Sequence, residues 1–487
     1  MKLALDVPTA ALICLNTVLL AVYLAKKFKS RDSEILTAGF CFPIIGHALP
    51  VLYAHTRFLA WCRARYGGVY KLRLPQEDVI VISDPVAILH LQTRSPKELG
   101  PFKYQRTGPI SGISEARVPH LFHILHRHVY PVAANALTPT RLAGSTARTA
   151  FNLDWALRRL SHNTDAMVQV DMLDLVTRIV FRASFTTFWG DRVPELLPDF
   201  LIYDKNMFFV VGDVPLLGRT GRRARERLVS TMHSYLIQHR SVPTDDVADE
   251  GGTIIAKAIR ILEESGVTDD EIARCLVIIL WGINGNIIQV AIWLMIYLTS
   301  TPSAFIRVRD AVRSAHPGIE PDPESLSEHF DDIPILDSAI KEVLRLVALP
   351  GTDRVTLVDI TLPLQDGRTQ AVRKGEHLLL DVRGVHHDPL YHRDPTAFKV
   401  DRFLDPEAKY GNHAGVKTLI PWGGGMFMCK GRDYAQRIIK LYFIILLQLY
   451  DIELQGSTTI PSPVRQSVTA AHPESYPPIK IRRRTSL

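Results

Sequence analysis

The sequence of 487 residues contains little cysteine and little excess of charge of either sign. Its five cysteines are few, odd in number and widely separated, which excludes the disulfide framework of a small secreted domain. They are Cys14, Cys41, Cys62, Cys275 and Cys429. The net charge of +7 is mild for this length and does not indicate a nucleic-acid-binding protein. With 47% hydrophobic and 22% charged residues, the composition is that of a folded globular protein, which excludes a disordered or collagen-like chain.

Internal repeats are also absent, and no linker poor in apolar residues divides the chain after its first 31 positions. We therefore expect one large domain over residues 32–487, mostly α with a small β portion. Strand-like patterns occupy 68–82 and 354–380, and Asp84 is a predicted helix cap. Residues 115–350 are mostly helical in pattern. A last helix is predicted over Arg432–Tyr450, and the Pro-rich end of the chain is expected to be irregular.

The first apolar run, from Val7 to Ala25, contains 19 residues without a charge. A helix of about 20 apolar residues is long enough to cross a membrane. Lys26, Lys27, Lys29 and Arg31 follow it and are typical of a cytoplasmic flank. We predict that residues 1–31 form a retained single-pass anchor, with the rest of the chain on the cytoplasmic side. A cleaved signal peptide and a buried core helix are the alternatives.

A second long apolar segment covers residues 270–299. Its interior is interrupted by small and polar residues, which lipid does not accommodate without partners. These residues are Gly282, Asn284, Gly285, Asn286 and Gln289. The pattern therefore favours a helix through the core of a large domain over a second membrane span.

The most specific segment is Pro421 to Arg432, with the sequence PWGGGMFMCKGR. Consecutive glycines allow the backbone to approach a flat group closely. Cys429 follows them just before a predicted helix, where free N–H groups and the helix dipole stabilise a thiolate. The pattern indicates a metal-binding cysteine, and the alternative is a glycine turn beside an ordinary buried cysteine.

A second feature is the Glu342-Val-Leu-Arg345 sequence. Positions i and i+3 share one face of a helix, so the two side chains can pair. Taken alone, this pattern is a common surface ion pair. Arg402, farther along the chain, is a candidate to complete a carboxylate–guanidinium cluster.

In this order and spacing, these features resemble the cytochrome P450 superfamily of haem-thiolate enzymes, over almost the whole chain. Trp422 stands for the Phe of the family's cysteine loop, and Gly425 and Gly431 match its glycines. The resemblance implies the P450 fold over 32–487 as the catalytic domain and haem b as the cofactor. It makes Cys429 the axial ligand of the iron, whose sulfur favours O–O cleavage. It also makes Glu342, Arg345 and Arg402 the buried triad that holds the cysteine loop.

Some positions depart from the family pattern. Phe427 stands where the family often has an Arg or His that contacts a haem propionate, so this pairing passes to other groups. The resemblance implies Arg354 and, more weakly, Arg127 for that role, since Phe122 replaces an expected Trp near Arg127. A histidine cluster in the same stretch does not indicate a metal site, because its members do not share one helical face. They are His120, His123, His126 and His128.

The central helix bears on the reaction. Where most oxygen-activating relatives carry an acid followed by Thr, this chain has Gly285 and Asn286. An Asn amide cannot ionise but can order a water and hydrogen-bond to bound oxygen. This stretch resembles the branch that contains sterol 7α- and 12α-hydroxylases and prostacyclin synthase. The glycines are expected to let the helix pass close to the haem. Candidate substrate contacts are Ile283, Ile287 and Ile288.

The resemblance implies a monooxygenase of the endoplasmic reticulum membrane that hydroxylates a lipophilic terpenoid or steroid-like substrate. It implies NADPH-cytochrome P450 reductase as the electron donor. Basic residues after Cys429 are a candidate docking patch for that reductase or, equally, a solvated helix face. They are Lys430, Arg432, Arg437 and Lys440. One alternative function is a haem-thiolate isomerase acting on a peroxide without external electrons, and another is a haem-containing binding subunit. No nucleic-acid partner is expected.

Overall fold

The computed structural model describes residues 35–484 with several gaps. The gaps are 40, 43–44, 76, 102–103, 161–165, 191–194, 241–249, 319–321, 349–352, 406–411, 414, 426–427, 455–458, 465–467 and 469. The predicted anchor at 1–31 and Phe427 both lie outside the described residues. The chain forms two compact units, each built from separate stretches of sequence. We call residues 1–102, 350–388 and 423–427 the sheet unit, and residues 103–349, 389–422 and 428–487 the helical unit.

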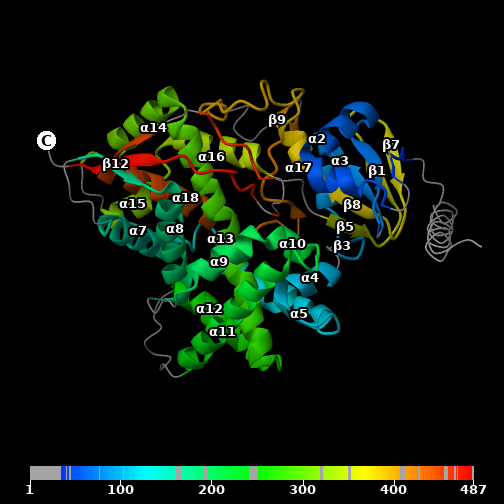
Figure 1. The fold of residues 1–487 in the computed structure, drawn as a ribbon, viewed down its shortest axis with the longest axis horizontal. Helices are drawn as coiled ribbons and strands as arrows, with labels where there is room; N and C mark the ends of the chain where they lie inside the picture. The colour runs from blue at the N-terminus through cyan, green and yellow to red at the C-terminus, as the bar shows by residue number, and fades with distance from the viewer. Residues whose placement is uncertain are drawn as a thin grey trace, which may run out of the picture. The chain divides into compact units, whose positions relative to one another are not determined.

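The sheet unit is built on five strands in the order β1-β2-β8-β5-β3, in which only β2 and β8 run parallel (Figure 1). The strands are β1 (Val69–Arg73), β2 (Asp78–Ile82), β8 (His377–Leu380), β5 (Asp353–Thr356) and β3 (Leu99–Pro101). β2 is buried almost throughout, as expected for an apolar run in an interior strand. The pairing of β1 with β2 confirms the hairpin predicted at 68–82.

The described residues of the sheet unit also form a second hairpin and three helices. β6 (Ile360–Pro363) pairs with β7 (Thr369–Val372), and Gly367 adopts φ +83° in the turn between them. Asp84 caps α3, where its carboxylate accepts the Ala87 N–H, and this confirms the predicted cap. The helices are α2 (Ala48–Tyr66), α3 (Pro85–Gln92) and α17 (Val382–His386).

The helical unit holds the larger core. Its helical elements are α4 (Tyr104–Ser111), α5 (Val118–Ile124), η1 (Leu125–Val129), α6 (Tyr130–Ala136), α7 (Ala143–Arg158), α8 (Met172–Trp189), α9 (Leu197–Lys205), α10 (Met207–Val211), α11 (Arg219–Arg240), α12 (Glu250–Glu264), α13 (Asp269–Thr299), α14 (Pro302–Ala315), α15 (Pro323–His329), α16 (Pro334–Val347) and α18 (Arg432–Leu449). The described part of the chain is therefore mostly helical with a smaller sheet content, as predicted.

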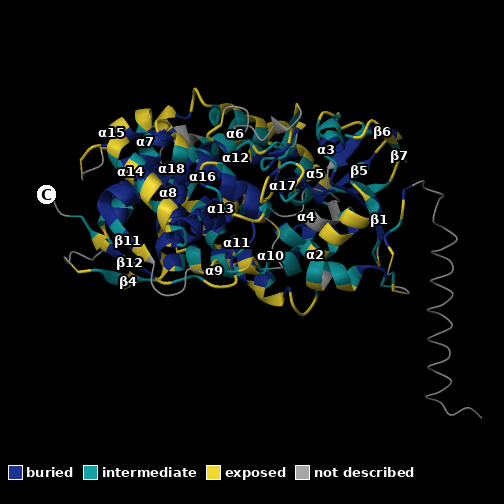
Figure 2. Cartoon of the chain, turned by 90° about the horizontal axis from the view of Figure 1, so that it is seen from above, coloured by how far each residue is buried: buried dark blue, intermediate teal, exposed yellow. Residues whose placement is uncertain are grey.

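The long helix α13 contacts α8, α9, α11 and α18 (Figure 1). Thr268 and Glu271 form a reciprocal capping box at its start, which fixes where the helix begins. Among the described residues, α13 alone is long and apolar enough to cross a membrane, but most of that stretch is buried inside the protein (Figure 2). This confirms the prediction of a core helix.

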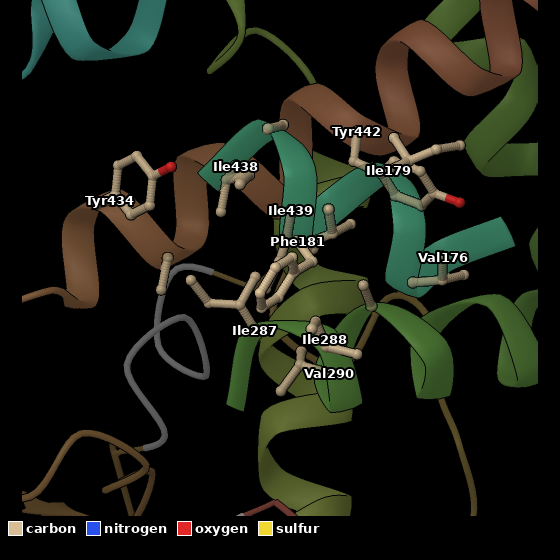
Figure 3. Close-up of a cluster of buried hydrophobic side chains, with 14 of the residues drawn as sticks. Val176, Ile179, Phe181, Ile287, Ile288, Val290, Tyr434, Ile438, Ile439 and Tyr442 are labelled. Atoms are coloured by element: carbon tan, nitrogen blue, oxygen red, sulfur yellow. The ribbon is translucent and has the colours of Figure 1, made fainter. Parts of the chain in front are cut away.

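Side chains from α8, α13 and α18 meet in the core (Figure 3). Phe181 of α8, Ile287 of α13 and Ile439 of α18 are among them, and each is at most 4% exposed. Burial of this kind contributes about 25 cal/mol per Å² of apolar surface. Since α13 carries Asn286 and α18 follows Cys429, the core fixes both helices that present the predicted site residues.

The expectation of irregular chain after Tyr450 is wrong in part. β11 (Tyr450–Leu454) pairs with β12 (Ile479–Arg483), which also pairs with β4 (Val168–Val170). Ile479 and Ile481 alternate toward the core, and this period of two supports a strand. The pairing joins segments far apart in sequence, which a local pattern does not reveal. A short pair of strands, β9 (Asn412–His413) and β10 (Val416–Lys417), completes the helical unit.

Candidate active site

Cys429 lies just before α18, in the helical unit. Its N–H donates to the Trp422 carbonyl at 2.9 Å, which closes the loop between them. Burial raises the pKa of the Cys429 thiol, while the Gly431 N–H and the charge of Arg432 act in the opposite direction. The residue still keeps exposed surface. The residue is therefore partly accessible and lies near a helix N-terminus, and a bound metal cation would hold its sulfur as the thiolate.

The donor set around Cys429 fits one kind of metal group. Among the described residues, no three His, Cys, Asp or Glu side chains lie close enough to form a metal cluster. Cys62 and Cys275 are fully buried, and burial raises their thiol pKa values to about 11 and about 12. Among the described residues, Cys429 thus belongs to no cluster of three such side chains, which suits a haem iron, because the porphyrin supplies the iron's other ligands.

The glycines before Cys429 have a structural reason besides the expected approach to a flat group. Gly424 and Gly425, in the sheet unit, lie against Gln92 at the end of α3. A Cβ on Gly425 would lie 1.9 Å from the Gln92 carbonyl oxygen, and Gly425 has φ +57°. Contact with Gln92 thus requires these glycines, whatever they contact besides. At Gly431 a Cβ would meet open space, so its surroundings in the structure do not demand glycine.

The structure brings Glu342, Arg345 and Arg402 together. Arg345 donates Nε and Nη2 to the two carboxylate oxygens of Glu342 at 2.8 and 2.9 Å. Arg402 donates Nε to both oxygens at 2.9 Å. Glu342 and Arg345 are fully buried, so this is a desolvated cluster and not the surface pair that the local pattern alone suggested. Arg345 also donates to the Pro395 carbonyl, and Arg402 to the Arg393 carbonyl, both at 2.7 Å. The cluster therefore ties α16 to the chain around 393–402.

Asn286 lies on an exposed part of α13, with exposed Gly282 one turn before it. Its Oδ1 accepts the backbone N–H of Ala470 at 2.8 Å. The oxygen and nitrogen of an Asn amide are told apart by their hydrogen-bond partners. Because the Ala470 N–H is a donor, the amide atom that it contacts is the oxygen. The Nδ2 group is left as a donor on the other side of the amide. Asn286 thus offers N–H groups and no ionisable group.

Gly285 and Asn284 face the protein interior. A Cβ on Gly285 would lie 3.0 Å from Trp281 Nε1 and 3.3 Å from Asp204 Oδ1, so the glycine makes room for the hydrogen bond between those two groups. Asn284 accepts from the Ser184 hydroxyl at 2.5 Å and is fully buried. These positions serve packing inside the helical unit.

The predicted substrate contacts on α13 need correction. Ile287 and Ile288 are 4% and 1% exposed and pack in the core formed with α8 and α18 (Figure 3). Because their side chains pack in this core, they do not line an accessible surface. Ile283 is half-buried. The sequence positions of these three isoleucines did not show which face of α13 is buried.

The two predicted propionate contacts differ in their surroundings. Arg354, on β5 of the sheet unit, is 6% exposed, and burial lowers its pKa to about 10 against the charge of Asp353. A desolvated guanidinium is a suitable partner for a carboxylate. Arg127 is exposed. Its neighbour His126 stacks on Phe122 with ring centres 3.7 Å apart, and the charge of Lys430 contributes to lowering its pKa after burial. The charge of Lys430, the residue after Cys429, therefore acts on His126.

The basic docking patch is smaller than the sequence suggested. Lys440 is buried and pairs with Asp331 and with Asp337, the latter at 3.1 Å. Arg437 donates to the Thr146 hydroxyl at 2.9 Å and to the Pro139 carbonyl at 3.0 Å. Both side chains thus stabilise the helical unit. Lys430 and Arg432 remain as candidate basic contacts near Cys429.

Comparison with known proteins gives a consistent family. A sequence model of the family described as Cytochrome P450 matches residues 38–478. The 7-alpha-hydroxycholest-4-en-3-one 12-alpha-hydroxylase of Oryctolagus cuniculus is 26% identical over 452 residues, which is 87% of this chain and 87% of that protein. Cytochrome P450 7A1 of Sus scrofa is 29% identical over 328 residues, covering 62% of this chain and 63% of that protein.

Prostacyclin synthase of Bos taurus is more similar over a shorter stretch. It is 35% identical over 204 residues, so the match spans 40% of this chain and only 41% of the synthase. Among solved structures, retinoic acid bound cyanobacterial CYP120A1 has a TM-score of 0.72 and 21% identity, with 93% of this chain and 100% of that chain covered. At that identity the likeness shows the fold.

Proposed function

The chain belongs to the cytochrome P450 family and is a haem-iron oxidoreductase of it, and we propose that it is a monooxygenase that hydroxylates a lipophilic terpenoid or steroid-like substrate. Its electrons come from NADPH-cytochrome P450 reductase. Residues 1–31 anchor it in the endoplasmic reticulum membrane, and residues 32–487 form the catalytic domain on the cytoplasmic side.

The observation that carries the proposal is the exposed Cys429 just before α18, which belongs to no cluster of three metal-ligating side chains among the described residues. We assign it as the axial ligand of haem b. A thiolate-bound haem supplies oxygen activation for insertion into C–H bonds. The family resemblance further assigns Arg354 and Arg127 as propionate contacts and Trp422, Gly425 and Phe427 as haem contacts.

The protein's own residues supply support and a hydrogen-bond donor. Glu342, Arg345 and Arg402 hold the chain around 393–402 against α16, and this cluster is assigned to support the cysteine loop. Asn286 is assigned to order a water and to donate from Nδ2 toward the reacting oxygen, in place of an acid and Thr. Gly285 supports this position by admitting the Trp281–Asp204 hydrogen bond beside it.

The relatives support the proposed substrate class. Those that align over most of this chain are named as hydroxylases of sterol-derived compounds, and their lipophilic substrates support the proposed class. The lack of an acid–Thr pair at 285–286 and the similarity to prostacyclin synthase favour one second candidate, a haem-thiolate isomerase of a peroxide. Such an enzyme needs no external electrons.

One experiment separates the two. Microsomes containing the full chain and a matched reductase are treated with carbon monoxide and reduced once with dithionite and once with NADPH. A thiolate-type band with both reductants is the expected result and supports a reductase-coupled monooxygenase. A band with dithionite alone, repeated in the presence of sterol-like lipids, supports the isomerase. No thiolate-type band with either reductant overturns the Cys429 assignment.

A further inference from the structure

Residues Ala470, Ala471 and His472, which we call the 470–472 segment, each bond to a helix of the helical unit. Ala470 donates its N–H to Asn286 Oδ1 at 2.8 Å. Ala471 donates its N–H to the Val347 carbonyl at 3.1 Å and accepts from Trp293 Nε1 at 2.5 Å. His472 places Nε2 3.2 Å from Asp204 Oδ2. Three successive residues are thus held by three helices, α9, α13 and α16.

Asp204 is the centre of this arrangement. The side chain lies on α9 and is 3% exposed. Trp281 Nε1 donates to its Oδ1 at 2.9 Å, and Gln289 Nε2 approaches Oδ2 at 3.4 Å beside His472. Both oxygens of this buried carboxylate are therefore engaged, as burial of a charged group requires. Two of its partners are on α13, and the third is in the 470–472 segment.

The cluster and Asn286 share the same helix and the same segment. Gly285, next to Asn286, has no Cβ, and this leaves the room that the Trp281–Asp204 hydrogen bond occupies. Asp204 contacts His472, and His472 is two residues after Ala470. The N–H of Ala470 in turn donates to the Asn286 amide. A change in how His472 is held therefore alters the position of the N–H that selects the orientation of that amide.

We propose that Asp204 and His472 are positioning residues for Asn286. They hold the 470–472 segment so that the Ala470 N–H stays bonded to the Asn286 oxygen. The Nδ2 hydrogens of Asn286 then face away from Ala470 as fixed donors. The inference rests on the proposed function, since it gives those donors a role beside the haem. Neither Asp204 nor His472 contacts the reacting atoms in this role.

The test uses the full-length, haem-loaded protein and the infrared C–O stretching band of its ferrous carbon monoxide complex. A hydrogen-bond donor near the carbon monoxide oxygen lowers this frequency, so the band reports the Asn286 donors without turnover. Asn286→Ala sets the frequency without them. Asp204→Asn and His472→Phe are expected to give a broadened band or two bands between the wild-type and Asn286→Ala positions. They are also expected to lower product formed per NADPH.

Matched variants make the result specific. His472→Gln keeps a side-chain donor for Asp204 and is expected to restore a narrow band near the wild-type position. His329→Phe removes an exposed histidine that lies 3.5 Å from Asp332 and is expected to change nothing. If Asp204→Asn yields no haem-loaded protein, His472→Phe with its His472→Gln rescue decides the question.

The outcomes separate this inference from the proposed function. A wild-type band in Asp204→Asn and His472→Phe, with a shifted band in Asn286→Ala, overturns the positioning role and leaves the proposed function intact. An unshifted band in Asn286→Ala removes Asn286 from the haem side, and with it the positioning role. Absence of the thiolate-type spectrum in the wild-type protein overturns the proposed function itself.

Discussion

Arg402 places its Nε 2.9 Å from both carboxylate oxygens of Glu342, 60 positions earlier in the chain. Arg345 pairs with the same carboxylate from within α16, so two guanidinium groups share one buried anion. Removing the carboxylate would leave two guanidinium groups without an anion in a buried site, which is strongly destabilising. The strength of the cluster is therefore visible in single substitutions.

Glu342→Gln is expected to destabilise the protein by about 3–5 kcal/mol, because Arg345 and Arg402 would keep their charges in a buried site without an anion. Haem-loaded protein should be nearly lost. Urea unfolding and the yield of the carbon monoxide difference band measure both effects. Arg307→Ala is the control, since it breaks an exposed pair with Asp401, the residue next to Arg402, and such pairs contribute at most about 1 kcal/mol. Equal losses in both variants would contradict the assigned role of the cluster.

Gly425→Ala is expected to cost about 2–4 kcal/mol, because the new Cβ would meet the Gln92 carbonyl oxygen and the residue would keep a positive φ. Gly431→Ala is the comparison, since its Cβ would meet open space at φ −94°. It should change the free energy of unfolding by less than about 1 kcal/mol. Thermal unfolding of both variants measures the difference. A stable Gly425→Ala variant would mean that α3 and the glycine loop separate easily.

Glu271→Gln is expected to destabilise the protein at neutral pH by about 1–2 kcal/mol, the value of a helix cap with a bidentate arginine contact. The Arg117 guanidinium, at 2.7 Å, and the Thr268 cap lower the pKa of the Glu271 carboxyl to about 2. A carboxyl with a lowered pKa in the folded state stabilises the fold above its ordinary pKa. That contribution falls as the pH drops from about 4.5 toward 2.

Urea unfolding at pH 7 and pH 3 checks this dependence. The deficit of Glu271→Gln relative to the wild type should be smaller at pH 3, where the wild-type carboxyl contributes less. Glu264→Gln, at the exposed end of α12, is the control and should show little deficit at either pH. A deficit of Glu271→Gln that stays constant between the two pH values would show that charge is not its cause.

Cys429→Ala is expected to abolish the thiolate-type carbon monoxide spectrum. Cys275→Ala should preserve it, because that thiol is fully buried in the core and burial raises its pKa to about 12. Difference spectra at matched protein concentration make the comparison. Persistence of the thiolate-type band in Cys429→Ala would assign the iron ligand elsewhere.

Features that rest on local sequence pattern were predictable, such as the hairpin at 68–82, the Asp84 cap and the long core helix. The pairing of Glu342 with Arg345 follows from helix periodicity, but its burial depends on what packs around α16. The contact of Asn286 with Ala470 lies beyond local patterns because the residues are 184 positions apart. The sequence pattern places Lys440 on the surface, but in the fold it pairs with Asp331 and Asp337. Long-range packing therefore decided which polar residues face the site.

Asn286→Ala is expected to lower product formed per NADPH by about tenfold and to raise peroxide release, a loss equivalent to one hydrogen bond of roughly 1.4 kcal/mol. Asn286→Asp separates the hydrogen-bond donors of the amide from its contact with the Ala470 N–H. Its carboxylate keeps an oxygen for the Ala470 N–H but has no N–H groups to donate. It should therefore unfold like the wild type and still lose coupling. Product and peroxide assays with thermal unfolding measure the two effects.

Asn284→Ala is the matched control, since the Asn284 amide is buried one turn after Leu280 and bonded to Ser184 and the Leu280 carbonyl. Its loss should lower stability by about 1–3 kcal/mol and leave product per NADPH unchanged. Uncoupling in Asn284→Ala equal to that in Asn286→Ala would indicate a general disturbance of α13. Full coupling in Asn286→Asp would show that the donors of the amide are not required, because only the contact with Ala470 survives in that variant.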